Sequence, residues 1–135
     1  MSAFVVFDTS VLVNDLRTGR YDDSIQNVTG IVRLSSVVLA ELLRGAGTPS
    51  ERNFVSQLAR SRPVLTPTKN NWLESGEILN RMRSDFGYTP GKLRDLHFDV
   101  LIALTARTHG ARLITSNRGD FEAIRRYRGF ELEVW

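Results

Sequence analysis

The sequence contains no cysteine and only two histidines, His97 and His109. Without cysteine there is no disulfide framework and no thiolate metal site, which fits a reducing compartment. No apolar run approaches the ~20 residues that a membrane-spanning helix needs. The first residues, MSAF, lack the basic region of a signal peptide. We therefore expect a cytoplasmic protein that does not associate with a membrane.

Lysine is also scarce, since Lys69 and Lys92 are the only lysines in the chain. Arginine supplies nearly all of the positive charge, and the net charge is +3. An arginine-rich chain is compatible with nucleic acid, because the guanidinium group matches phosphate geometry. It is equally compatible with an acidic protein partner. The length of 135 residues, with 41% hydrophobic and 24% charged residues, predicts one globular domain over residues 1–135.

Short runs of β-forming residues alternate with longer segments of helical character. The runs predict strands at residues 4–7, 31–35, 63–65, 111–115 and 130–134. The segments between them predict helices at residues 9–16, 37–44, 49–59, 66–84, 96–109 and 121–126. Residues 17–30 have no clear period, which leaves a short helix there open. Strands that alternate with helices predict an α/β fold, with a mostly parallel sheet between two helical layers.

The long helix at residues 66–84 is expected to turn one apolar face toward the core. Its spacing is compatible with a helix face that carries Trp72, Ile78, Leu79 and Met82. Residues 88–94 are expected to form a loop before the apolar helix at 96–109.

Acidic side chains follow the predicted strands. Asp8 comes directly after the first strand, Glu41 lies on the helix after the second, and Asp99 lies in the first turn of helix 96–109. Asn117 and Asp120 occupy a predicted loop, residues 116–120, after the strand at 111–115. Ligands of open α/β sheets lie beyond the carboxyl ends of the strands. Clustered carboxylates need protons or a cation, and an all-oxygen site selects Mg²⁺ or Mn²⁺.

Each acidic residue also has a structural interpretation. Asp8 could cap the following helix, and Asp120 could cap a helix that begins at Phe121. Glu41 could be a surface residue on an amphipathic helix. Thr9 and Ser10 either cap a helix or orient Asp8 or a metal-bound water.

The histidines are weaker candidates than the acids. His97 precedes Asp99 by two positions and either faces the site or is a cap or surface residue. His109 precedes a helix-ending glycine and is given no functional role.

Taken together, four stretches resemble a PIN-domain ribonuclease, specifically the VapC-type toxin of a toxin–antitoxin pair. They occur in family order and cover nearly the whole length: FDTSVL (7–12), SVVLAEL (36–42), DVLIA (99–103) and LITSNRGDF (113–121). The resemblance implies a Mg²⁺- or Mn²⁺-dependent endoribonuclease that leaves a 5′-phosphate and a 3′-hydroxyl. It carries over Asp8, Glu41 and Asp99 as catalytic metal ligands.

The fourth position departs from the fuller family pattern. Many relatives have an acid where this chain has Asn117, and a second acid where it has Asp120. Asp120 is therefore the fourth candidate catalytic residue and metal ligand, while Asn117 is a candidate ligand only through its neutral carbonyl. Arg94 and Arg118 are candidates for holding RNA phosphates.

The resemblance also implies partners. These are an RNA substrate, with tRNA and rRNA as candidates, a cognate antitoxin that lies beside the active site, and a second copy in a homodimer. A separate motive for self-association is that Val37-Val38-Leu39 and Leu42-Leu43 could exceed what a small core can hide.

Alternatives from other classes fit less well. A receiver domain needs a lysine beyond a late strand, and neither Lys69 nor Lys92 is placed there. An aspartate-nucleophile phosphatase needs a second aspartate at position 10, which is Ser10. A non-catalytic PIN domain that binds RNA or protein is the surviving alternative.

Overall fold

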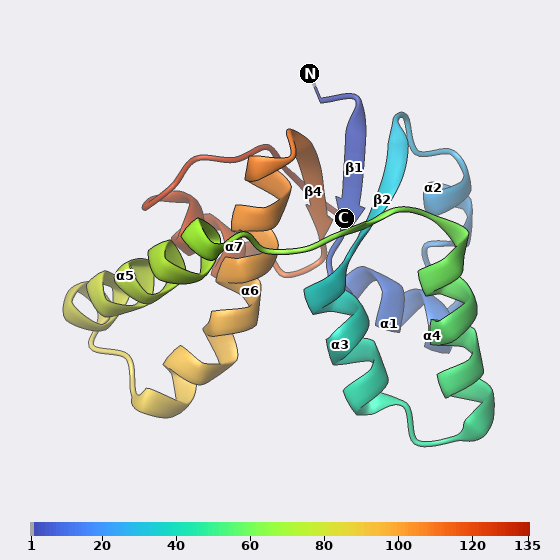
Figure 1. The fold of residues 1–135 in the computed structure, drawn as a ribbon, viewed down its shortest axis with the longest axis horizontal. Helices are drawn as coiled ribbons and strands as arrows, with labels where there is room; N and C mark the ends of the chain where they lie inside the picture. The colour runs from blue at the N-terminus through green and yellow to red at the C-terminus, as the bar shows by residue number, and fades with distance from the viewer. Residues whose placement is uncertain (1) are drawn as a thin grey trace.

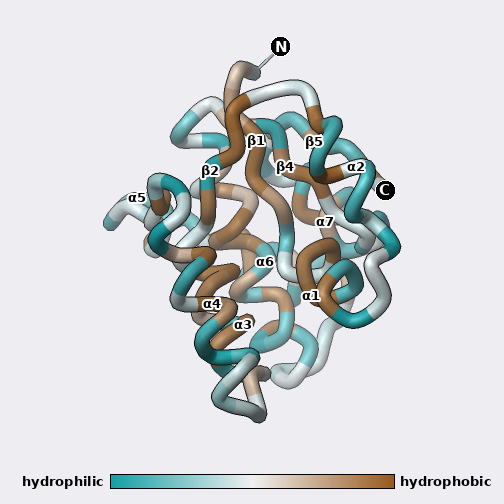
Figure 2. Tube along the Cα trace, turned by 90° about the vertical axis from the view of Figure 1, so that its right-hand side faces the viewer, coloured by the Kyte–Doolittle hydropathy of each residue, from teal (hydrophilic) through white to brown (hydrophobic). Residues whose placement is uncertain are grey.

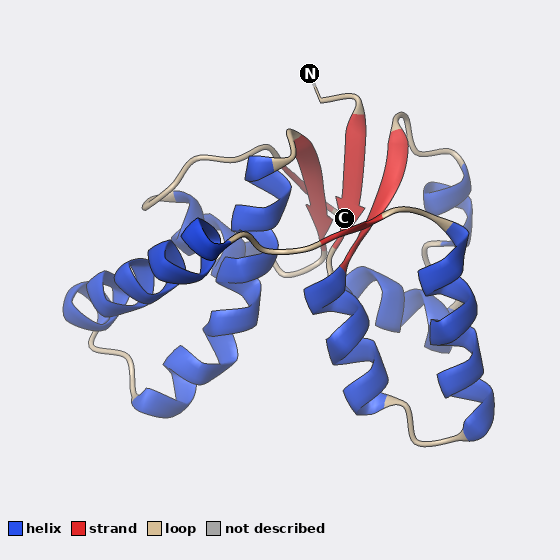
Figure 3. Ribbon diagram, in the orientation of Figure 1, coloured by secondary structure: helices blue, strands red, loops and turns tan. Residues whose placement is uncertain are grey.

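The computed structural model describes residues 2–135 and has a five-stranded sheet at its centre, in the order β3-β2-β1-β4-β5. Every described pairing is parallel. Figure 3 shows the strands between blue helices. The predicted α/β class with a central parallel sheet is confirmed. The strands are β1 (Phe4–Phe7), β2 (Ile31–Ser35), β3 (Val64–Leu65), β4 (Ala111–Thr115) and β5 (Leu132–Val134).

Alternate residues of β1 serve two different cores, because successive side chains of a strand point to opposite faces. Val6 packs with Leu34 of β2 and Leu113 of β4 in the larger core. Val5 and Phe7 pack on the other face in a smaller core. Figure 2 shows β1 as a mostly hydrophobic segment in the middle of the molecule.

Helices cover both faces, as the three-layer prediction requires. The smaller core is closed by α1 (Thr9–Thr18) and α2 (Asp22–Gln26), which resolves the open question over residues 17–30. In Figure 1 the carboxyl ends of β1 and β4 lie above α1 and α3 and beside α6. The larger core is closed by α3 (Ser36–Gly45), α4 (Pro49–Ser61), α5 (Lys69–Phe86), α6 (Pro90–Thr108) and α7 (Arg118–Arg125).

Helix α6 begins well before the predicted position 96. The hydroxyl of Thr89 accepts a hydrogen bond from the Lys92 backbone N–H at 3.2 Å, and Pro90 occupies the first turn. Proline suits that position, because its missing N–H would have no helical partner there. The predicted loop over residues 88–94 is therefore wrong beyond Thr89. Asp99 lies in the middle of this helix, not in its first turn.

Helix α7 also begins early, at Arg118, so the loop predicted over 116–120 is too long. The Asn117 side chain accepts a hydrogen bond from the Asp120 backbone N–H and caps the helix. The interpretation of Asp120 as a cap for a helix at Phe121 is therefore wrong. Asp120 lies in the first turn, where a carboxylate is favoured by the helix dipole.

The buried face of α5 runs through Asn71, Ser75, Ile78 and Met82. Ile78, Leu79 and Met82 are in the core as predicted, but Trp72 is 51% exposed. The prediction for Trp72 is wrong because Asn71, its neighbour, occupies the inward stripe of the helix.

The apolar residues of α3 are mostly core. Val37, Val38, Leu39 and Leu42 are buried, and only Leu43 is substantially exposed, at 48%. The argument that this stretch leaves surplus apolar surface is therefore wrong except at Leu43. Within residues 2–135 no helix combines the length and the apolar character required to cross a bilayer.

Candidate functional site

Asp8 directly follows β1 and is 3% exposed. Its backbone N–H donates to the Ile114 carbonyl at 2.8 Å, which extends the pairing of β1 with β4 by one residue. Asp8 stands at the N-cap position of α1, but its side chain makes no capping hydrogen bond. The capping interpretation of this carboxylate is therefore wrong, and its partners lie elsewhere.

Two hydroxyls hold the Asp8 carboxylate. Ser10 Oγ donates to Oδ2 at 2.7 Å, and Thr115 Oγ1 donates to the same oxygen at 2.8 Å. The Thr115 hydroxyl also accepts from the Asn117 backbone N–H at 2.9 Å, so it links Asp8 to the start of α7. Thr115 is the residue that sequence reasoning missed. The feature that could have revealed it is a hydroxyl residue at the end of β4, the strand that pairs with β1.

Glu41 projects from α3 toward the N-terminus of α1. Thr9 Oγ1 donates to Glu41 Oε1 at 2.7 Å, and the Glu41 side chain is only 18% exposed. Arg44 lies 3.8 Å from the other oxygen. Burial, and to a smaller extent the charge of Asp8, raises the pKa of Glu41, while Thr9 and Arg44 lower it. The interpretation of Glu41 as an ordinary surface residue is therefore wrong.

Asp99 has a strongly raised pKa. Burial raises the pKa of Asp99 to about 8, and the charges of Asp8, Glu41 and Asp120 add to the effect in that order. Lys92 acts in the opposite direction. Four carboxylates from four separate segments therefore share one electrostatic environment.

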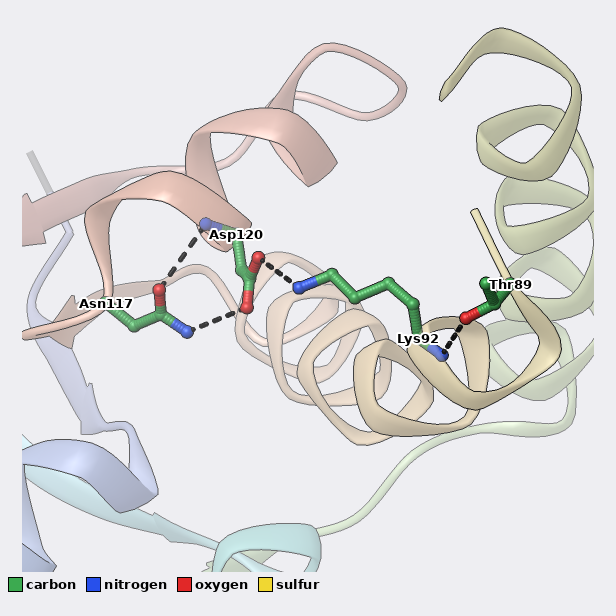
Figure 4. Close-up of polar contacts among 4 residues, drawn as sticks. All are labelled: Thr89, Lys92, Asn117 and Asp120. Carbon is green, nitrogen blue, oxygen red and sulfur yellow. Dashed lines mark hydrogen bonds and ion pairs between the residues drawn. The ribbon is translucent and has the colours of Figure 1, made fainter. Parts of the chain in front are cut away.

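Asp120 is held on both oxygens, as Figure 4 shows. Lys92 Nζ donates to Oδ1 at 3.0 Å, and Asn117 Nδ2 donates to Oδ2 at 3.1 Å. The hydrogen bond to Asp120 is the main cause that raises the pKa of Lys92. The contacts join the first turns of α6 and α7.

The remaining candidates lie outside this network. His97 Nε2 is 3.1 Å from Ser75 Oγ, and the His97 and Trp72 rings form a T-shaped pair. Arg118 pairs with Glu122 at 3.3 Å on the exposed side of α7. Arg94 is exposed, two residues before the buried Leu96 of α6.

The donor set of this site is entirely oxygen, and its negative charges are only partly compensated. Both properties fit a hard divalent cation such as Mg²⁺. Among residues 2–135, however, no three acidic or histidine side chains are grouped closely enough to hold an ion as they stand. The carboxylates would have to move closer together to share one.

Sequence comparison identifies the family. The PIN domain matches residues 5–127. This chain belongs to the PIN-domain family. The resemblance noted in the sequence is thereby confirmed. No curated protein matches the chain in sequence.

Solved structures share this PIN fold over nearly the full length. A chain of VapBC-1 from nontypeable Haemophilus influenzae is 22% identical, with a TM-score of 0.73 and 98% of each chain covered. A chain of VapBC2 from Rickettsia felis, bound to a DNA fragment from its promoter, gives the same values. A chain of VapBC-5, a toxin–antitoxin system of Mycobacterium tuberculosis, is 20% identical with a TM-score of 0.67, covering 98% of this chain and 99% of its own. The PIN domain described here thus has the fold found in these toxin–antitoxin complexes.

Proposed function

We propose that this PIN domain, taken as one domain over residues 1–135, is a Mg²⁺- or Mn²⁺-dependent endoribonuclease and the toxin of a toxin–antitoxin pair. The observation that carries the proposal is the shared electrostatic environment of Asp8, Glu41, Asp99 and Asp120. These residues come from the end of β1 and from α3, α6 and α7 of a PIN fold, and like charges are kept together only where a cation or proton offsets them.

In this proposal Asp8, Glu41, Asp99 and Asp120 are the metal ligands and the catalytic acidic residues. When bound, a divalent cation lowers the pKa of a water molecule for attack on a phosphodiester and neutralises charge on the phosphoryl oxygens. The Asn117 carbonyl oxygen accepts the capping hydrogen bond from the Asp120 N–H, and the Asn117 amide donates to Asp120 Oδ2. We therefore assign Asn117 to positioning Asp120.

The hydroxyls have a positioning role. Ser10 and Thr115 both donate to Oδ2 of Asp8, so they fix the plane of this carboxylate before any ligand arrives. Thr9 does the same for Glu41. Oriented ligands reduce the reorganisation that binding requires, which is the general basis of preorganised sites.

The test is cleavage of a structured RNA by the full chain in Mg²⁺ and in EDTA. We expect cleavage in Mg²⁺, products with a 5′-phosphate and a 3′-hydroxyl, and no cleavage after Asp8→Asn. Asp95→Asn is the matched control, because Asp95 is an exposed carboxylate on α6. RNA binding without cleavage by the unmodified chain would overturn the enzyme proposal in favour of a non-catalytic PIN domain.

The partner of the proposed toxin is an antitoxin protein. Support comes from the structural similarity to chains of VapBC complexes and from a pocket between α1, α3 and α4. Leu16, Leu42 and Val55 line this pocket, and Glu41, Glu51 and Arg17 also border it. An apolar lining beside two carboxylates and one arginine suits a partner segment that carries an apolar residue and a cation.

Two measurements test the partners. Co-purification of the product of an adjacent short reading frame would support the antitoxin, and Leu16→Asp should weaken that complex without unfolding the chain. The homodimer rests on the family resemblance and on exposed Leu43. Sedimentation that shows a monomer throughout the micromolar range would contradict it.

A further inference from the structure

Lys92 is the one lysine at the acidic site. It lies in the first turn of α6. Thr89 caps the helix through the Lys92 backbone N–H, and the Lys92 side chain then reaches across to α7, as Figure 4 shows. Its ammonium lies 3.0 Å from Asp120 Oδ1. The only other lysine, Lys69, is exposed at the start of α5. The two lysines therefore have different surroundings: Lys92 is paired with a carboxylate, and Lys69 is exposed to solvent.

The Lys92 ammonium places a positive charge beside the acidic side chains of the site. It forms an ion pair with Asp120, and both side chains are partly exposed. Asn117 donates a hydrogen bond to the second oxygen of Asp120, so both oxygens of this carboxylate have a partner. A divalent ion that binds Oδ1 of Asp120 would lie close to the Lys92 ammonium on the same oxygen, and the two positive charges repel each other.

We propose that Lys92 is an internal counter-cation, which holds Asp120 and competes with the divalent metal ion for this carboxylate. The inference rests on the proposed metal-dependent function. It adds that this chain weakens its own metal binding, so that the site fills only when the ion is abundant enough to displace the lysine.

The properties of the pair fit a displaceable cation. The Lys92 side chain is 38% exposed, and partly exposed ion pairs are weak. A lysine ammonium sits on a flexible stem and makes no fixed bidentate contact, so it can turn to solvent when a stronger cation arrives. Lys92 is thus a positioning residue that acts through Asp120.

The experiment is calorimetric titration of the full chain with Mn²⁺ alone, in buffer freed of other divalent ions. Lys92→Met should lower the Mn²⁺ dissociation constant about fivefold, the factor that corresponds to a weak ion pair. Lys92→Arg keeps the charge and should bind Mn²⁺ as the unmodified chain does, or more weakly. Lys69→Met removes the other lysine and should leave the dissociation constant unchanged.

A second background shows whether Lys92 acts through Asp120. In Asp120→Asn the competing carboxylate is gone, so adding Lys92→Met should change the Mn²⁺ dissociation constant by less than about twofold. The same fivefold effect in both backgrounds would overturn the inference, because the lysine would then act only through space. Thermal unfolding of each variant in EDTA checks that the fold is retained.

The failure of this inference can be told apart from failure of the proposed function. If the unmodified chain binds Mn²⁺ and Asp99→Asn does not, the metal site stands, and an unchanged or weaker affinity in Lys92→Met overturns the inference alone. An increase in the KM for RNA with unchanged Mn²⁺ affinity would assign Lys92 to substrate phosphate instead. If the unmodified chain binds no Mn²⁺, both proposals fall.

Discussion

Replacing Asp99 by asparagine should stabilise the metal-free protein near neutral pH, although it removes a proposed ligand. The pKa of Asp99 rises from its ordinary value of 3.8 to about 8 in the folded chain. Each pKa unit is worth about 1.4 kcal/mol, so Asp99 opposes folding by up to about 6 kcal/mol above pH 8, where it is ionised, and by about 4 kcal/mol at pH 7, where the folded chain must take up a proton. Asparagine has nearly the same shape and carries no charge to bury.

The direction of the pH dependence follows from proton binding. Between about pH 4 and pH 8 the folded chain holds a proton on Asp99 that the unfolded chain has released. The contribution of Asp99 to the free energy of unfolding is therefore most favourable below pH 4, and it falls as the pH rises toward 8. Glu41, whose pKa is also raised, contributes in the same direction.

The assay is urea unfolding in EDTA at several pH values from 5 to 8. The unmodified chain should lose stability across this range, and Asp99→Asn should lose distinctly less and be the more stable protein at pH 7.5. Asp95→Asn, which changes an exposed carboxylate of the same helix, should follow the unmodified chain. Parallel curves for Asp99→Asn and the unmodified chain would refute the reasoning, because they would show that Asp99 is not destabilised by its surroundings.

Three further predictions concern the packing and the fourth acidic position. Thr115→Val removes the buried donor to Asp8 and should cost about 1–3 kcal/mol in urea unfolding; an unchanged midpoint would argue against that bond. Met82→Ala should cost about 2–5 kcal/mol because the residue is fully buried, whereas Trp72→Ala should cost distinctly less because half of that side chain is exposed; equal losses would contradict the observed face of α5. Asn117→Asp should lower the Mg²⁺ concentration for half-maximal cleavage and Asp120→Asn should raise it; superimposable titrations would exclude both positions from metal binding.

The sequence alone determined the sheet and the order of the acidic residues. The runs that form β1, β2 and β4 are rich in β-branched residues and end sharply, and each matches its predicted span. Such strands are recognisable because their preference is local and their pattern is short. The positions of Asp8 and Glu41 relative to strand ends followed directly.

Helix starts were predicted less well, although local signals were present. Thr89-Pro90 caps α6 in the same way as Thr48-Pro49 caps α4, so a local signal marks the start of each helix. The start of α7 depends on Asn117, a cap of ordinary type inside a stretch that otherwise resembles a loop. These boundaries were therefore readable in principle from capping chemistry.

Only the tertiary structure decided the partners of the site residues. The contact of Thr115 with Asp8 joins residues from opposite ends of the chain, and it exists because β4 pairs directly with β1. The raised pKa of Asp99 likewise depends first on its burial in the fold and then on charges brought from three other segments. Lys92 reaches Asp120 only because the first turns of α6 and α7 lie side by side. A residue's own neighbours in sequence fix its element, but Coulomb and hydrogen-bond interactions act through space, so the chemistry of this site was set by the fold.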